Sequence, residues 1–195
     1  MLILGAGALL QMGQIRSAAE DISTNSVPSI QNLDEFTQLA LRLRVLSYRL
    51  LINREPEVQQ KTMELLDLRN QEIRVAETQY EKYISSPQEQ AVYDRYKQLM
   101  VQYGQLQDRM RSYSRNDQVD QLRELLNTEL LENSEAINKE LNNLMRINGQ
   151  QITEANQHAS DMYSAAIKMV VFLLLLATVL TIVCALILTR SISQP

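Results

Sequence analysis

Apolar residues recur every three or four positions along most of this chain, which is the spacing that places them on one face of an α-helix. The clearest series lies early in the chain and consists of Phe36, Leu39, Ala40, Leu43, Leu46 and Leu50. Glycine is absent between Gln14 and Tyr103, and good helix formers such as Leu, Gln, Glu and Arg dominate. The pattern predicts an all-α protein.

Three short polar segments interrupt this periodicity, at residues 53–56, 85–89 and 112–117. Helices that are joined by short connections pack as antiparallel neighbours. We therefore expect an up-down-up-down antiparallel four-helix bundle. Its helices are predicted at residues 14–53, 57–84, 88–113 and 117 onward.

Residue types at the interruptions support these boundaries. A proline in each of the first two segments suits the first turn of a helix, where its missing N–H has no intrahelical partner to lose. Ser86 and Glu89 have the spacing of a capping box. In the third segment, Ser114 or Asn116 is the candidate cap for the last helix.

The first and the last of the four predicted helices each have a feature that affects their shape. Pro28 removes a backbone donor, so we expect the first helix to bend near residues 26–27. The last helix contains no breaker except Gly149, so it is predicted to run unbroken over residues 117–189 and continue into a membrane segment. At about 1.5 Å per residue, this helix would be roughly 110 Å long.

Residues 169–189 form an uncharged, apolar segment between Lys168 and Arg190. As a helix the segment spans roughly 32 Å, close to the hydrocarbon core of a bilayer, which is about 30 Å thick. The segment therefore predicts a transmembrane helix. Positive residues favour the cytoplasmic side, so Arg190 predicts that the preceding domain faces outward.

The first dozen residues are also apolar, but they are too short to cross a bilayer and lack the charged leader of a signal peptide. We interpret them as the end of a first transmembrane helix. The predicted organisation has four parts: the C-terminal part of that helix at 1–13, an outer domain at 14–166, a second transmembrane helix at 167–189 and a following linker at 190–195.

Charge and chemistry narrow the function classes. The 19 Lys and Arg residues are interspersed with 23 Asp and Glu residues, which gives no basic patch for nucleic acid. The single cysteine, Cys184, lies in the membrane segment, so no disulfide is expected in the outer domain. The single histidine, His158, has no cluster at metal-ligand spacing, and no phosphate loop or nucleophile motif appears. We predict no enzyme and no cofactor.

The first helix has a second apolar stripe, which points well away from the core series on a helical wheel. Its members are Leu41, Val45, Tyr48 and Ile52, spaced four, three and four residues apart. A helix in a monomeric bundle has no use for a second stripe, and exposed apolar surface commonly marks an interface. We therefore expect a homodimer packed along this stripe.

Arginines border this second stripe: Arg44 on one side, and Arg42 and Arg49 on the other. In a two-fold dimer each occurs twice, and their guanidinium groups repel one another unless anions bind. The planar guanidinium suits a carboxylate, so one hypothesis is a site for a small organic acid that also involves Tyr48. The alternative is that the arginines extend along the interface and pair with Glu35, Glu55 or acids of the partner.

Three further groups are open to two interpretations. Antiparallel pairing places Asn127 and Thr128 near Arg44, where they would contact a ligand or simply be solvated. Asn148 lies within the apolar stripe of the last helix, and we interpret it as a residue that fixes helix register. Five tyrosines have ordinary packing spacings and are assigned to the core or helix interfaces: Tyr80, Tyr83, Tyr93, Tyr96 and Tyr103.

Four segments together resemble one known family, the bacterial methyl-accepting chemotaxis proteins with a four-helix-bundle sensor. They are NSVPSI at 25–30, LRLRVLSYR at 41–49, Ser86-Pro87, and TRSISQP at 189–195, which is similar to the entry into a HAMP domain. The resemblance covers nearly the whole chain. It implies a multi-pass protein of the bacterial inner membrane, with a periplasmic sensor, that forms homodimers and signals through HAMP to a cytoplasmic kinase complex.

The resemblance also implies where a ligand binds. In aspartate-sensing members, first-helix arginines of both subunits hold the carboxylates near the membrane-distal end of the dimer interface. Arg42, Arg44 and Arg49 match by position and type, although their spacing differs from that pattern. Related receptors bind citrate, malate or aromatic acids, and signalling is expected to involve a small sliding of the last helix.

The prediction is therefore a chemoreceptor sensor for a small organic acid, with Arg42, Arg44, Tyr48, Arg49, Asn127 and Thr128 as candidate ligand contacts. Two alternatives stay open. The same bundle also suits the sensor of a histidine kinase or cyclase, or a module that senses through a periplasmic binding protein.

Overall fold

The computed structural model describes residues 13, 16–17, 19–20 and 22–192. Of residues 1–13, which are predicted to end a first membrane helix, residues 1–12 lie outside this described part. The chain divides into two compact units: residues 24–151, and residues 1–23 with 152–195. The first of these units contains the bundle.

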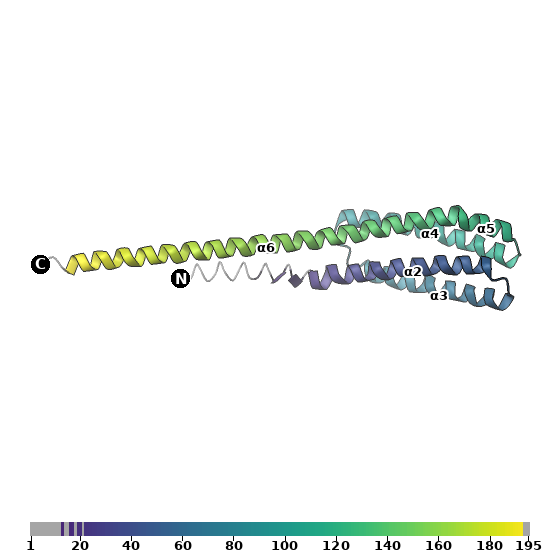
Figure 1. The fold of residues 1–195 in the computed structure, drawn as a ribbon, viewed down its shortest axis with the longest axis horizontal. Helices are drawn as coiled ribbons and strands as arrows, with labels where there is room; N and C mark the ends of the chain where they lie inside the picture. The colour runs from purple at the N-terminus through teal and green to yellow at the C-terminus, as the bar shows by residue number, and fades with distance from the viewer. Residues whose placement is uncertain (1–12, 14–15, 18, 21, 193–195) are drawn as a thin grey trace. The chain divides into compact units, whose positions relative to one another are not determined.

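The described chain is helical, as the sequence predicts (Figure 1). A short π-helix, η1 (Ile22–Ser26), precedes α2, and the remaining elements are α2 (Val27–Ile52), α3 (Pro56–Tyr80), α4 (Pro87–Arg115), α5 (Val119–Asn127) and α6 (Glu129–Ile192). α2, α3 and α4 are three helices of the bundle. α5 and the first part of α6 together form the fourth.

Contacts at the two ends of the bundle establish its up-down-up-down order. At one end, Arg54 after α2 forms an ion pair with Asp117 after α4. At the other end, Tyr80 in the last turn of α3 donates a hydrogen bond of 2.7 Å to Glu89 in the first turn of α4. Ser29, near the start of α2, lies at this same end. The prediction of an antiparallel four-helix bundle is confirmed.

Aromatic rings fill one part of the bundle core. Phe36 of α2 stacks on Tyr96 and meets Tyr80 edge-on, with ring centroids 5.6 Å apart in both pairs. Tyr93 joins the cluster through Tyr80 and Tyr96 at 5.3 and 5.8 Å. These distances suit favourable aromatic pairs. Tyr103 is also buried, so the core assignment is confirmed for four of the five tyrosines, whereas Tyr83 is half-buried in the turn after α3.

A buried polar network joins four helices beside these rings. Asn148 of α6 is 1% exposed, accepts a hydrogen bond of 2.7 Å from the Ser29 hydroxyl and donates one of 2.9 Å to the Glu89 carboxylate. The same carboxylate oxygen accepts from the Tyr80 hydroxyl, while the other accepts from the backbone N–H of Ser85 at 2.9 Å. This supports the interpretation that Asn148 fixes helix register, since its bonds require one alignment of the helices.

The predicted capping box at the start of α4 forms with one difference. The N–H of Glu89 donates to the Ser86 hydroxyl at 3.2 Å, as expected. The Glu89 side chain, however, bonds to the N–H of Ser85 rather than to that of Ser86. The bend expected near residues 26–27 stays a prediction; the π-helix ends at Ser26 and α2 begins at Val27, with Pro28 in its first turn.

The cap predicted at Ser114 or Asn116 is wrong. Asp117 has a φ of 56°, the left-handed conformation that commonly ends a helix. The N–H of Gln118 donates to the carbonyl of Tyr113 at 2.9 Å, and that of Asp117 donates to Ser114 at 3.4 Å. These are the two hydrogen bonds of a Schellman motif, so this segment terminates α4 instead of capping α5.

The last helix is interrupted once near its start, but from Glu129 it runs unbroken through the apolar segment at residues 169–189, as predicted. Thr128 has φ −122° and ψ −99°, which separates α5 from α6. Its hydroxyl donates to the carbonyl of Glu124, four residues earlier, at 2.7 Å. This bond alone does not explain the break, because Thr37, Thr62 and Thr78 make the same bond inside helices that continue.

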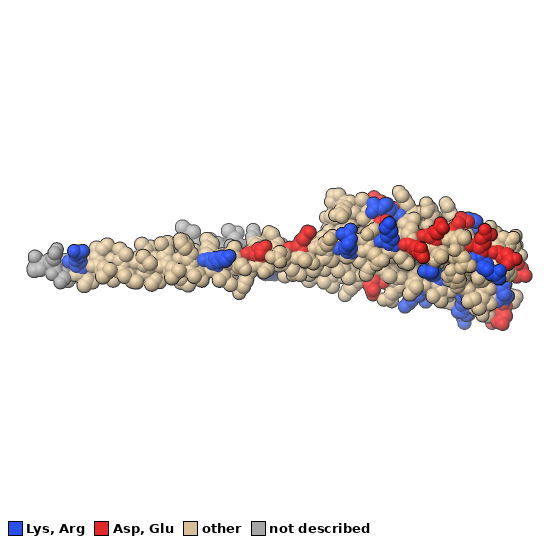
Figure 2. All heavy atoms as spheres, turned by 45° about the horizontal axis from the view of Figure 1, so that its top comes forward, with Lys and Arg blue, Asp and Glu red and all other residues tan. Residues whose placement is uncertain are grey.

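Within the described residues, one helical stretch is long and apolar enough to cross a membrane, and it includes residues 169–189 of α6. None of its most apolar window is buried inside the structure. Figure 2 shows this apolar stretch without charge, whereas charged side chains of both signs are interspersed on the bundle surface. Length, composition and exposure all suit a membrane span.

We predict that Asn148→Leu destabilises the bundle. The change leaves Ser29 and Glu89 each short of a buried hydrogen bond, which costs about 2–3 kcal/mol. The measurement is urea unfolding of the full chain in detergent micelles, followed by circular dichroism. Asn142→Leu, at an exposed position of the same helix, is the matched control and should stay within about 0.5 kcal/mol of the parent. Equal stabilities of the two variants would contradict the role given to the network.

We also predict that the bundle loses stability at alkaline pH. Burial raises the pKa values of Tyr80, Tyr93, Tyr96 and Tyr103 above the ordinary 10.0, and Glu89 adds to the effect at Tyr80. The unfolded chain releases these protons first, so the stabilisation is complete below pH 10 and is lost above it. Each tyrosine that stays neutral contributes a slope of about −1.4 kcal/mol per pH unit there.

Urea unfolding of the chain in micelles between about pH 8.5 and 11.5 tests this slope. Tyr103→Phe should reduce the steepness of this slope by about 1.4 kcal/mol per pH unit, which is the contribution of one tyrosine proton. A return to pH 8.5 should restore the folded signal, which separates titration from chemical damage. Constant stability across this range would contradict the prediction.

Candidate functional site

The second stripe of α2 lies on the surface of the bundle. Leu41, Val45 and Ile52 are 60%, 61% and 74% exposed, while Leu43 and Leu50 on the core side are buried. The stripe contains a shallow hollow of about 490 Å³, lined by Leu41, Arg44, Val45, Tyr48, Arg49, Ile52 and Asn53. The helix α2 therefore has two apolar faces: one is packed in the core, and the other is exposed on the surface.

The three arginines of the stripe have no acidic partner within the part of the chain that the structure describes. Arg42 is exposed, and Arg44 and Arg49 are half-buried. Ion pairs form elsewhere in the bundle, such as that between Arg54 and Asp117 just beyond this helix. Glu35 and Glu55, the intrachain partners considered from the sequence, form no ion pair with these arginines.

Tyr48 connects the stripe to the end of α5. Its hydroxyl donates to the carbonyl of Leu126 at 3.2 Å and lies 3.3 Å from the side-chain oxygen of Asn127. α5 ends at Asn127, and the last carbonyl groups of a helix lack intrahelical partners. Tyr48 therefore supplies a donor at the junction where α5 gives way to α6.

The candidate ligand contacts are only partly brought together. Arg44, Tyr48 and Arg49 line the same hollow, and Asn127 reaches it through its contact with Tyr48. Arg42 and Thr128 do not line the hollow, and the Thr128 hydroxyl is used within its own helical turn.

Arg44 is not placed against Asn127 and Thr128. It lines a small cavity of about 20 Å³ together with Ser134, Asn138 and other residues of α2, α4 and α6. The sequence places Asn127 level with Arg44, whereas Asn127 contacts Tyr48, one turn further along α2, so Ser134 and Asn138 lie beside Arg44 instead. No signal in the sequence marks them.

Across the described residues, no group of three or more His, Cys, Asp or Glu side chains is arranged to hold a metal ion. The site consists of arginine, tyrosine and amide groups beside apolar side chains. Such a site can bind an acceptor-rich or anionic molecule, because guanidinium groups offer only donors.

Comparison with known proteins agrees with this architecture. The family model described as a four helix bundle sensory module for signal transduction matches residues 1–163. A search of the curated proteins finds no match. The module is a signalling domain rather than a catalytic one, and the bundle and the candidate membrane helix described above are consistent with a membrane receptor. The chain belongs to the four-helix-bundle sensory modules of methyl-accepting chemotaxis proteins.

Proposed function

We propose that this chain is the sensor of a transmembrane chemoreceptor that binds a small organic acid between the α2 helices of two copies. The observation that carries the proposal is the presence of Arg44 and Arg49, with no acidic partner in the described chain, beside an exposed apolar stripe. Arg42, Tyr48, Asn127 and Thr128 complete the candidate contacts.

The exposed stripe supports dimerisation. Leu41, Val45 and Ile52 together leave a continuous apolar surface in water, and burial of such surface against a second copy is favourable. A two-fold axis along α2 brings each arginine close to its symmetry mate. A bound dicarboxylate or hydroxy acid then offsets the repulsion between guanidinium groups.

The contact of Tyr48 with the end of α5 supports a route for the signal. A ligand affects signalling only if it has different affinities for two arrangements of the protein. Because Tyr48 bonds at the α5–α6 junction, a ligand that contacts Tyr48 stabilises one arrangement of that junction over another. The start of α6 moves with the junction, and α6 includes the apolar segment at residues 169–189.

In this proposal the bundle, at residues 14–166, faces the periplasm, and the segment at 167–189 crosses the bacterial inner membrane. Residues 190–195 begin a HAMP linker that passes the signal to a cytoplasmic kinase-control module. The apolar segment of α6 supports the membrane crossing, and the match to a sensory module supports signalling as the output.

A carboxylate screen tests the ligand site. We expect at least one of citrate, malate, aspartate and benzoate to raise the thermal unfolding midpoint of the full chain in lipid nanodiscs. Arg44→Ala and Arg49→Ala should each reduce this shift, because each removes a charged contact worth about 1.5–3 kcal/mol. Arg146→Ala, an exposed arginine of α6, is the control. A shift that survives both stripe variants would refute the arginine site.

A charged substitution in the stripe tests the dimer. Val45→Asp should lower the dimer fraction of the full chain in detergent, measured by analytical ultracentrifugation, because it buries a carboxylate in an apolar interface. Val75→Asp makes the same change at a position of α3 that is 57% exposed and should have no effect. Equal dimer fractions for both variants would argue against this interface.

A further inference from the structure

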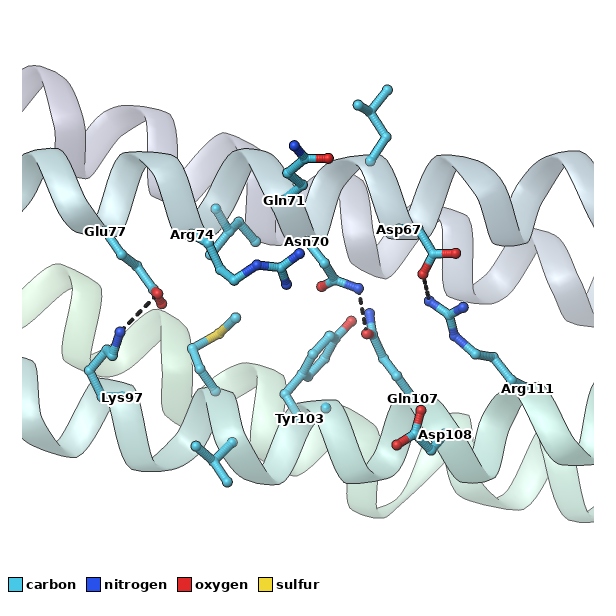
Figure 3. A pocket seen from close by; sticks show the side chains of 15 residues that line it. Asp67, Asn70, Gln71, Arg74, Glu77, Lys97, Tyr103, Gln107, Asp108 and Arg111 are labelled. Carbon is cyan, nitrogen blue, oxygen red and sulfur yellow. Dashed lines mark hydrogen bonds and ion pairs between the residues drawn. The ribbon is translucent and has the colours of Figure 1, made fainter.

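A second hollow lies on a different side of the bundle, between α3 and α4 (Figure 3). It has a volume of about 780 Å³, and its lining includes polar side chains from both helices. None of the stripe residues lines it. We call it the α3–α4 groove.

Three buried polar atoms at the α3–α4 groove make no hydrogen bond of normal geometry: the Tyr103 hydroxyl, which has Ser47 and Gln107 as its polar neighbours, Nε2 of Gln107 and Nε of Arg111. Tyr103 and Gln107 are each only 3% exposed. The orientation of the Gln107 amide follows from Asn70, which donates to its carbonyl oxygen at 2.8 Å. Arg111 uses a terminal nitrogen to bind Asp67 at 2.6 Å, which leaves its Nε–H free.

These unpaired groups share one chemical property. The nitrogens of Gln107 and Arg111 can only donate, and the tyrosine hydroxyl can donate as well. Buried donors without acceptors destabilise a fold, so their partners are normally present as protein, water or ligand. The groove is large enough for a small molecule, and that molecule must supply acceptors.

The unpaired donors, rather than the net charge of the lining, favour a carboxylate as the source of these acceptors, because the acidic and basic side chains of the groove are equal in number. Glu77 pairs with Lys97 at 2.9 Å, and Asp67 pairs with Arg111, so these four charges cancel. Arg74 has no ion pair within the described part of the chain, and Figure 3 shows its side chain in the space between the two helices. Asp108 of the lining also has no ion pair within the described part of the chain, and both Arg74 and Asp108 are exposed, so water and salt screen the two charges alike.

Gly104 keeps one wall of the groove open. A Cβ added at this position of α4 would meet no atom within 4 Å. Glycine inside a helix costs up to about 1 kcal/mol relative to alanine, and here it leaves room beside Tyr103.

We infer that the α3–α4 groove is a second ligand site, which binds a small carboxylate through Arg74, Gln107, Tyr103 and Arg111. The carboxylate oxygens accept from the unpaired donors, and Arg74 supplies the compensating charge. The site is separate from the α2 stripe and stands whether or not that stripe binds a ligand.

Calorimetric titration of the full chain in lipid nanodiscs tests this site, with acetate, lactate and glycine as probes and acetamide as the uncharged control. At least one carboxylate should bind, and acetamide should bind more weakly. Arg74→Met and Tyr103→Phe should each weaken that binding by about tenfold or more, which is the scale of one lost hydrogen bond to a charged group. Gly104→Leu, which fills the groove, should abolish it.

Two controls separate this site from folding defects and from the stripe. Tyr103→Phe removes an unpaired hydroxyl, so the ligand-free variant should unfold at the parent's temperature or above. Arg146→Met should bind the probe as the parent does, and binding at the α2 stripe would survive Gly104→Leu, whereas binding in the groove would not. The proposal is wrong if none of the three carboxylates binds, or if Arg74→Met and Gly104→Leu leave the binding unchanged. In either case, water satisfies the donors of the groove.

Discussion

The structure depends on how a carboxylate is held inside the bundle. Glu89 is fully buried, and burial of a charged side chain costs several kcal/mol unless donors surround it. Tyr80, Ser85 and Asn148 provide those donors, and the position of Glu89 in the first turn of α4 adds the favourable field of a helix N-terminus. Because these donors come from three different segments of the chain and Ser29 anchors Asn148 to α2, the helices must align in one register to satisfy the carboxylate. One polar cluster thereby sets the alignment at one end of the bundle.

The positions of the α2 stripe and of the break at Thr128 depend on this fixed alignment. The aromatic rings beside the network pack against α2, α3 and α4, so the α2 stripe is held facing outward. The break at Thr128 lies further along, beside the hydrogen bond from Tyr48 to the Leu126 carbonyl of α5. A rigid end and an interrupted helix in one bundle suit a sensor, because a ligand can change only an element that has an alternative arrangement.

The two proposed sites differ in construction. The α2 stripe is apolar with arginines at its border, and it needs a second copy to enclose a ligand. The α3–α4 groove lies within one bundle, and its lining includes buried polar atoms of Tyr103, Gln107 and Arg111 that make no hydrogen bond. Tyr103 lines both that groove and the small cavity that contains Arg44, so one side chain lies between the two regions.

The sequence by itself determined the helical class, the interruptions at Pro56 and Pro87 and the apolar stripe of Leu41, Val45 and Ile52, since all of these follow from periodicity and local residue chemistry. It also indicated that Asn148 is structural, because a lone amide in an apolar stripe must find a buried partner. Only the tertiary structure decided which partner it finds, because Ser29 is 119 residues away in the chain. The break at Thr128, the neighbours of Arg44 and the unpaired donors beside Tyr103 likewise depend on how whole helices pack, and no local pattern encodes that packing.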